Sequence, residues 1–184
     1  MPSLASPLTM PTVSRYMSIK RDTITLQPDF RFLLAHPAHL IALGFGSGLA
    51  PKAPGTVGTV LGLPLFWLIA TTAPDLPNRI ILLVATFLLG IWACGRTGRA
   101  LGVPDHGGMV WDEIVAFALV LLFAPPGWPW IALAFALFRL FDILKPWPIR
   151  FADTHLKNGF GVMFDDLLAA GYAIAVIKGL QWLV

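Results

Sequence analysis

The sequence contains little charge and almost no cysteine. Only 12% of its 184 residues are Asp, Glu, Lys or Arg, whereas a soluble domain typically has about 25%. Hydrophobic residues make up 57%, and the mean hydropathy is +0.74. This composition excludes a disordered chain and a coiled coil, and it favours a membrane protein over a soluble globule. The single cysteine, Cys94, excludes a disulfide framework and a cysteine-based zinc site.

A strong excess of basic residues is also absent. The net charge is only +3 and the basic residues are scattered, so we expect no nucleic-acid partner. The length suits one domain, which we place at 38–184. Residues 1–37 contain several prolines and no long apolar run. They do not fit a signal peptide, and we expect a flexible N-terminal extension.

Long apolar stretches separate the few charged residues. They lie at residues 53–74, 80–95, 114–138 and 167–184. The third is broken into two helices by Pro125–Pro129, and a bilayer-spanning helix needs about 20 residues. The sequence therefore predicts an all-α, multi-spanning membrane bundle with four to five transmembrane helices. A glycine-rich stretch at 38–50 is expected to be a short re-entrant or interfacial segment, with a sixth span as the alternative.

The basic residues are distributed unequally between the two sides of these spans. Eleven of the thirteen lie before the first span or in loops on the same side as that segment, and only Arg79 and Lys178 lie on the other side. Because cytoplasmic loops carry an excess of Lys and Arg, five crossings with the basic side in the cytoplasm are predicted.

Half of the ten acidic residues lie at the predicted cytoplasmic ends of apolar helices. These are Asp112, Glu113, Asp142, Asp165 and Asp166. Five carboxylates in one layer repel one another, and a divalent cation relieves that repulsion. Mg²⁺ prefers carboxylate and phosphate oxygens, and no His/Cys set has zinc-like spacing. We therefore predict that these five residues bind Mg²⁺. The alternative is that the acids only cap helix starts and interact with helix dipoles.

A second pattern lies at the end of the fourth predicted helix. Arg139, Asp142 and Lys145 recur at i, i+3 and i+6 and share one helix face, and Pro146 then ends the helix. Arg139 and Lys145 are predicted to bind phosphate oxygens, together with Arg150. Asp142 is left for metal binding or general-base catalysis. A structural Arg139–Asp142 ion pair is the alternative.

The segment 44–59 is rich in glycine and carries several hydrogen-bond donors. Its backbone amides are suited to forming an anion-binding nest, to which Ser47, Lys52 and Thr56 add hydroxyl and ammonium groups. We assign these three to substrate binding. The segment lacks the Gly-Lys-Ser/Thr of a Walker A loop, and the alternative is a hinge that permits close helix packing.

One loop places a histidine shortly before the first acid pair. His106 lies in the Asp105-His106-Gly107-Gly108 loop and is predicted to donate or accept a proton. Asp105 is assigned to the same catalytic set. A surface histidine without a role is the alternative.

Together these motifs resemble the phosphatidylglycerophosphatase A family from about His39 to the end of the chain. The resemblance is carried by residues 44–58, 105–113, 138–149 and 165–166. It implies an all-α fold, Mg²⁺ dependence, a membrane phospholipid substrate, and a multi-pass protein of the bacterial cytoplasmic (inner) membrane whose active site faces the cytoplasm. No obligate protein partner is evident.

The expected function is hydrolysis of phosphatidylglycerophosphate to phosphatidylglycerol and inorganic phosphate, a step in phospholipid biosynthesis. The main alternative is a cation-coupled transporter or channel, which predicts acids near the membrane midplane and an internal repeat. The sequence shows neither. A lipid head-group transferase is less compatible, because its acids would follow one helix. A non-catalytic assembly factor leaves the clustered acids unexplained.

Overall fold

The computed structural model describes residues 27–183, and in that part of the chain every regular element is helical. The elements are α1 (Phe30–Ala35), α2 (Pro37–Ala42), the 3₁₀ segment η2 (Gly44–Leu49), α3 (Pro54–Thr72), α4 (Leu76–Leu101), α5 (Trp111–Phe123), α6 (Trp128–Leu144), α7 (Ile149–His155) and α8 (Gly159–Leu183).

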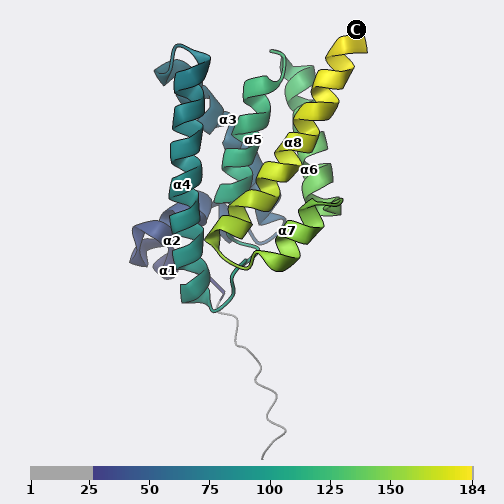
Figure 1. The fold of residues 1–184 in the computed structure, drawn as a ribbon. Coiled ribbons are helices and arrows are strands. Elements are labelled where there is room, and N and C mark those ends of the chain that lie inside the picture. Colours follow the sequence, from purple (N-terminus) through teal and green to yellow (C-terminus); the bar gives the residue numbers. More distant parts are fainter. Residues whose placement is uncertain (1–26, 184) are drawn as a thin grey trace, which may run out of the picture.

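The five long helices run alternately up and down (Figure 1). The short elements α1, α2, η2 and α7 gather at one end, which is the bottom of Figure 1 and is called the lower end below. The loop from α4 to α5 lies at that end as well. The glycine-rich segment therefore forms a short 3₁₀ turn at the lower end and is not a sixth span.

Three of the helices, α3, α4 and α8, are long and apolar enough to cross a membrane. With 13 and 17 residues, α5 and α6 are about 20 and 26 Å long, less than a hydrocarbon core of about 30 Å. The structure confirms the predicted all-α membrane bundle, with two of its five long helices shorter than a full span.

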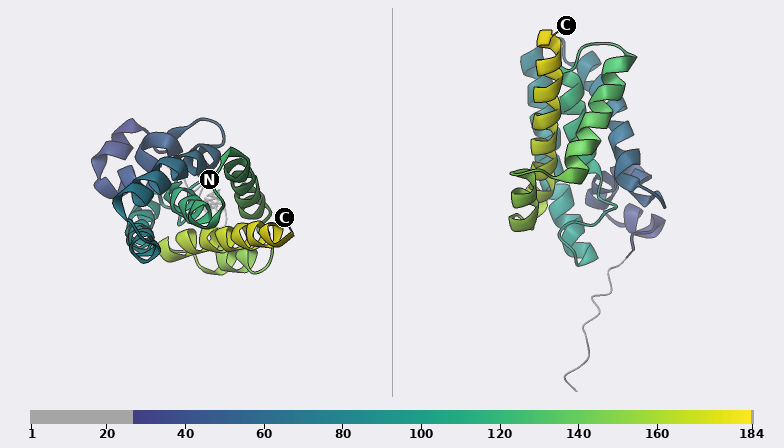
Figure 2. Two further views of the ribbon diagram at one scale, coloured as in Figure 1. Left: turned by 90° about the horizontal axis from the view of Figure 1, so that it is seen from above. Right: turned by 90° about the vertical axis from the view of Figure 1, so that its right-hand side faces the viewer.

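The shortness of α5 goes together with its central position. It contacts α2, α3, α4, α6 and α8, and the view from above in Figure 2 shows it surrounded by the other long helices. Nine of its thirteen residues are buried. Because protein rather than lipid covers its sides, α5 does not have to match the thickness of the bilayer.

Small residues bring α3 close to α5. A Cβ atom on Gly62 would lie 2.9 Å from both the Ile114 carbonyl oxygen and Phe117, and one on Gly58 would lie 2.6 Å from Val110. Only glycine fits at this distance, as at other small-residue contacts between membrane helices. Close helix packing, the alternative considered for the glycine-rich segment 44–59, is therefore observed at Gly58 and continues along α3 to Gly62.

The last helix starts earlier than its apolar run indicates. It begins at Gly159, where Asn158 Oδ1 accepts a hydrogen bond of 2.9 Å from the Gly161 amide. Asp165 and Asp166 consequently lie in the second turn of α8 and do not cap its start. Because the two charged aspartates interrupt the apolar pattern, the apolar run alone does not identify residues 159–166 as part of the helix.

Most of the predicted N-terminal extension, residues 1–26, lies outside the described residues. The remainder is folded: Asp29 Oδ1 accepts a hydrogen bond from the Phe32 amide at the start of α1, and Leu33 is buried. The Phe32 ring stacks on His39 of α2, and His39 Nδ1 lies 2.9 Å from Thr97 Oγ1 of α4. The packed unit thus begins before residue 38.

The α3–α5 contact predicts a specific sensitivity to one added methyl group. We expect Gly62→Ala to lower the stability by about 1–3 kcal/mol, because the methyl group would overlap the α5 backbone. Gly171→Ala is the matched control, since Gly171 is exposed in α8 with nothing within 4 Å of an added Cβ. Thermal unfolding in detergent measures both. A Gly62→Ala protein as stable as the control would contradict the described packing.

Candidate active site

Three carboxylates from two helices converge near the lower end of the bundle. Asp112 and Glu113 are in the first turn of α5, and Asp166 is in the second turn of α8. One oxygen from each lies within 4.8 Å of the others. We call these three residues the acid cluster. A spacing of this size is suited to sharing one cation through oxygen ligands.

The acid cluster is shielded from water and incompletely hydrogen-bonded. Asp112 is 8% exposed and Asp166 is 4% exposed. Asp112 Oδ1 accepts a bond of 3.0 Å from the Glu113 amide, but Glu113 Oε2 and Asp166 Oδ2 are buried without any partner. Buried carboxylate oxygens without a partner are strongly unfavourable. Free oxygens on adjacent carboxylates are what a hard cation such as Mg²⁺ needs, so the residues present fit this ion.

Arg139 of α6 forms the border of the acid cluster. Its Nη1 lies 2.6 Å from Asp142 Oδ2, 3.4 Å from Glu113 Oε1 and 3.5 Å from Thr59 Oγ1. The ion pair considered as an alternative at the sequence level is therefore formed, and the same guanidinium also reaches Glu113. Its Nε is buried without a partner, so Arg139 retains a free donor next to the carboxylates.

A glycine makes room for this arrangement. A Cβ atom on Gly55, in the first turn of α3, would collide with Glu113 Oε1 and lie 3.2 Å from Arg139 Nη1. Any side chain at this position would displace the carboxylate or the guanidinium. The first turn of α3 thus contributes space to the site rather than a functional group.

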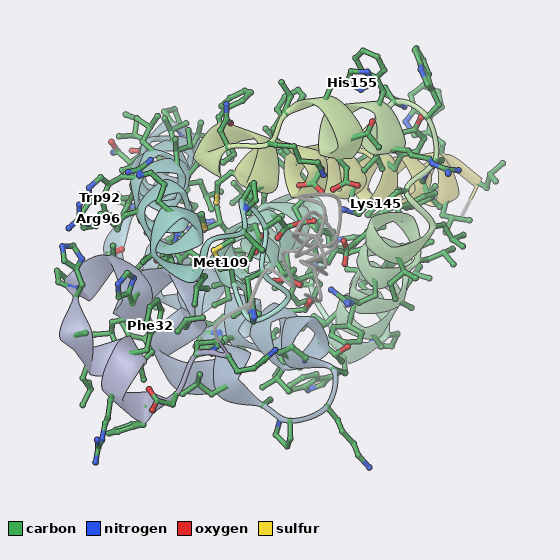
Figure 3. All side chains as sticks on the ribbon, turned by 90° about the horizontal axis from the view of Figure 1, so that it is seen from below. Phe32, Trp92, Arg96, Met109, Lys145 and His155 are labelled. Atoms are coloured by element: carbon green, nitrogen blue, oxygen red, sulfur yellow. The ribbon has the colours of Figure 1, made fainter. Side chains whose placement is uncertain are left out.

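Lys145 organises a second group of charges next to the acid cluster. Its Nζ lies 2.6 Å from Asp165 Oδ2 and 3.1 Å from Asp153 Oδ1, and Lys157 is 3.9 Å from the same Asp153 oxygen. Seen from the lower end in Figure 3, Lys145 lies beside carboxylate oxygens near the centre of the bundle. Burial lowers the pKa of Lys145, but its hydrogen bonds and attraction to Asp165 and Asp153 outweigh this and raise it. The ammonium group therefore stays charged.

The backbone at Lys145 is unusual for a residue with a side chain. Lys145 ends α6 with φ +43° and ψ +59°, the left-handed conformation that favours glycine. A strained backbone of this kind persists where the surroundings fix it, and it is frequent at functional sites. Here the conformation directs the ammonium group towards the carboxylates of α7 and α8.

The charges of this region do not balance within the described part of the chain. Its carboxylates are Asp105, Asp112, Glu113, Asp142, Asp153, Asp165 and Asp166, and its cations are Arg139, Lys145 and Lys157. Carboxylates therefore outnumber cations seven to three. This excess of negative charge favours binding of a cation.

The structure separates the five predicted metal ligands into three groups. Asp112, Glu113 and Asp166 form the acid cluster, Asp142 faces Arg139, and Asp165 faces Lys145. Neighbouring residues of a helix point about 100° apart, which is why Asp165 and Asp166 face different partners. Metal binding by these residues stays a prediction.

The two loop residues assigned to catalysis lie outside the acid cluster. Asp105 is exposed and borders a small cavity with Asp153 and Asp165. His106 is half-buried, and its Nδ1 accepts a hydrogen bond of 3.0 Å from the Gly108 amide. This bond fixes the turn before α5 and leaves Nε2 for proton transfer, so the catalytic role of both residues stays a prediction.

The four remaining substrate-binding candidates form no hydrogen bond or ion pair with the acid cluster among the described residues. Ser47 Oγ donates to the Gly44 carbonyl oxygen at 2.9 Å and so closes the η2 turn. Lys52 and Arg150 are exposed, and neither forms an ion pair with the described residues. Thr56 is half-buried next to Gly55. Their contact with substrate stays a prediction.

Asp153, Thr59 and Gly55 belong to this region but were not among the predicted site residues, although Gly55 and Thr59 lie in the glycine-rich segment 44–59. A signal existed for Thr59 and Gly55, because they are four residues apart and share a face of α3 with other small residues. Asp153 lies four residues before Lys157, a spacing that indicates only a surface pair on a helix. Its contact with Lys145 depends on how α7 folds back beneath α8.

The acids and their partners lie at one end of the bundle rather than at its midplane. This placement does not favour the transporter or channel considered as an alternative, which needs charged groups along a path through the membrane.

Comparisons with known proteins identify the family of the chain. The model of the family described as Phosphatidylglycerophosphatase A matches residues 40–181. The chain is 49% identical to the phosphatidylglycerophosphatase A of Haemophilus influenzae over 84% of this chain and 95% of that protein. It is 37% identical to the phosphatidylglycerophosphatase A of Escherichia coli over 80% of this chain and 85% of that protein.

A third relative is named for a different lipid. It is a Bacteroides thetaiotaomicron protein, provisionally named phosphatidylinositol-3-phosphatase, which is 39% identical over 79% of this chain and 94% of its own length. No solved structure matches the chain significantly. On the family match and the identities to the first two relatives, the chain belongs to the phosphatidylglycerophosphatase A family and is a phosphatase.

Proposed function

We propose that this phosphatase hydrolyses phosphatidylglycerophosphate to phosphatidylglycerol and inorganic phosphate. The reaction depends on Mg²⁺, takes place at the cytoplasmic face of the membrane and is a step in phospholipid biosynthesis. The names of the two phosphatidylglycerophosphatase relatives support the substrate. The proposal rests on the acid cluster, three carboxylates beside Arg139 at one end of an apolar bundle, two of which have a buried oxygen without a partner.

Asp112, Glu113 and Asp166 would hold Mg²⁺, with Asp142 and Asp165 close to them. When bound, Mg²⁺ neutralises phosphate charge and lowers the pKa of a coordinated water molecule. The fit rests on the donor set, which is entirely carboxylate oxygen, and on the two oxygens that have no other partner.

Arg139 and Lys145 supply positive charge for the phosphoryl group. Arg139 is suited to two parallel hydrogen bonds with phosphate oxygens, and Lys145 to a point-charge contact. Both are now paired with carboxylates, which keeps them oriented towards the site. Charge that develops on the phosphoryl oxygens during transfer is stabilised by such groups.

The reaction breaks the bond between phosphorus and the glycerol oxygen. A water molecule attacks phosphorus in line, its proton passes to Asp142, Asp105 or His106, and the glycerol oxygen leaves as an alcohol after receiving a proton. His106, with one ring nitrogen already bonded to the Gly108 amide, has the other nitrogen left for either transfer.

The distribution of basic residues supports a cytoplasmic orientation of the acid cluster. Lys52, Arg96, Arg99 and Lys157 lie in or beside elements of the lower end, whereas Arg79 and Lys178 belong to the other end. Since Lys and Arg are enriched on the cytoplasmic side, the acid cluster would face the cytoplasm, where phospholipid precursors are made.

The first test is phosphate release from phosphatidylglycerophosphate in mixed micelles. We expect release with Mg²⁺ and none after chelation, and a loss of at least about 100-fold in Asp166→Asn, because one oxygen ligand becomes a neutral amide. Phosphatidylinositol 3-phosphate, suggested by the Bacteroides relative's name, serves as a competing substrate.

Asp75→Asn is the control for this test, because Asp75 is an exposed carboxylate at the start of α4, at the opposite end of the bundle. It should keep nearly full activity. Release that is insensitive to chelation, or an Asp166→Asn protein as active as Asp75→Asn, would contradict the metal site.

The contacts of Arg139 predict that its shape matters as well as its charge. We expect Arg139→Lys to lower kcat/KM by about 10–100-fold, since a single ammonium group cannot make the two parallel hydrogen bonds to phosphate oxygens that a guanidinium group can make. Arg96→Lys is the control, because Arg96 is exposed on the outer side of α4 (Figure 3). Equal kinetics for the two variants would show that Arg139 acts as a charge alone.

The orientation is testable with single cysteines, since the native Cys94 is fully buried. Arg96→Cys and Asn78→Cys place exposed thiols at opposite ends of α4. With a membrane-impermeant maleimide, we expect Arg96→Cys to react only in inside-out vesicles. We expect Asn78→Cys to react only in cells whose outer membrane is permeabilised and whose inner membrane is intact. The reverse pattern would place the acid cluster on the other side of the membrane.

A further inference from the structure

An apolar groove leads from the acid cluster into the membrane-spanning part of the bundle. It has a volume of about 350 Å³ and lies between α4, α5 and α8. Nine of its ten lining residues are apolar, among them Leu83, Val84, Phe87 and Leu119, and the tenth is Asp112. We call it the α4–α8 groove.

The groove exists because α4 and α8 separate above a close contact. At the lower end they meet through glycines: a Cβ on Gly95 would lie 3.6 Å from Gly159, and one on Gly90 would lie 2.5 Å from Met163 Sδ. Higher up, Ala169, Ala173 and other residues of α8 pack against α5 and α6 instead. Figure 1 shows α8 leaning away from α4 as it rises.

Asp112 connects the groove to the proposed chemistry. It lines the groove and belongs to the acid cluster. From Phe87 to Ile80 the groove follows about 10 Å of α4 towards the other end of the bundle. Six of its ten lining residues belong to α4 and α8, which are long and apolar enough to span a membrane, and Val84, on its border, is 50% exposed.

These features decide between possible occupants. An ion or a polar metabolite would find no partner along the apolar walls. A protein helix, with a diameter of about 10–12 Å, is too large for a groove of about 350 Å³. An alkyl chain fits the shape, the lining and the direction, because a lipid whose phosphate lies at the cytoplasmic interface extends its chains towards the membrane centre.

We propose that the α4–α8 groove binds one acyl chain of the lipid substrate and so positions the terminal phosphate at the acid cluster. This inference rests on the proposed function and adds the lipid-binding part of the same site. Since a chain leaves one apolar environment for another, the groove contributes little affinity from the hydrophobic effect. Its contribution is orientation, which lowers the entropic part of the barrier.

The test combines a chain-directed probe with a matched pair of variants. Val84→Trp fills the groove, whereas Val60→Trp puts the same bulk on α3, where Val60 is 48% exposed and lines no described cavity. The probe is phosphatidylglycerophosphate with a diazirine on one acyl chain, photolysed on ice immediately after mixing, and labelled peptides are identified by mass spectrometry.

We expect labelling of α4, α5 and α8 residues that line the groove. Unlabelled phosphatidylglycerophosphate should compete with this labelling, whereas phosphatidylcholine with the same chains should not. The labelling should be lost in Val84→Trp and kept in Val60→Trp. We also expect Val84→Trp to lower kcat/KM for the long-chain substrate about tenfold or more, with Val60→Trp close to the unmodified protein.

Labelling spread evenly over the lipid-facing helices, or groove labelling that phosphatidylcholine removes equally well, would show a bulk lipid chain and overturn the proposal. Equal kinetics for the two tryptophan variants would also overturn it. If the unmodified protein labels in the groove yet releases no phosphate, the proposed function fails while the groove remains a specific chain-binding site, so the two failures are distinguishable.

Discussion

Burial of several carboxylates among apolar helices is the constraint on which the rest of this structure depends. Asp112, Glu113 and Asp166 cannot remain ionised next to one another without compensating charge. Arg139 provides one part of that charge at the border of the acid cluster. We propose that a cation, bound by the two buried oxygens without a partner, provides the rest. In the proposed function, a bound divalent ion turns this excess of negative charge, which alone would repel a phosphate, into a phosphate-binding site.

A short central helix and close helix packing position the carboxylates of the acid cluster. Because α5 is surrounded by protein, its first turn presents Asp112 and Glu113 to the interior, and Gly55 leaves the space that the Glu113 carboxylate occupies. The separation of α4 from α8 opens a groove beside Asp112. In our proposal, this end of the bundle joins a polar reaction centre to an apolar groove for a lipid chain.

Much of the fold could be predicted from the sequence, because apolar runs and prolines determine where membrane helices lie. The break at Pro125–Pro129 and the end of α6 before Pro146 agree with the structure. The start of α8 was missed because Asp165 and Asp166 interrupt its apolar pattern. Within the site, the acids and Arg139 stand out as rare charges in an apolar chain. Asp153, which lies outside the apolar runs, and Gly55 were not identified, since their roles depend on which helices meet and not on local pattern.

The most direct test of the central claim is to locate the ion in a crystal structure with Mn²⁺ in place of Mg²⁺. We predict an anomalous difference peak within coordination distance of oxygens from Asp112, Glu113 and Asp166. A peak confined to Asp153 and Asp165, or no peak at a Mn²⁺ concentration that supports phosphate release, would contradict it.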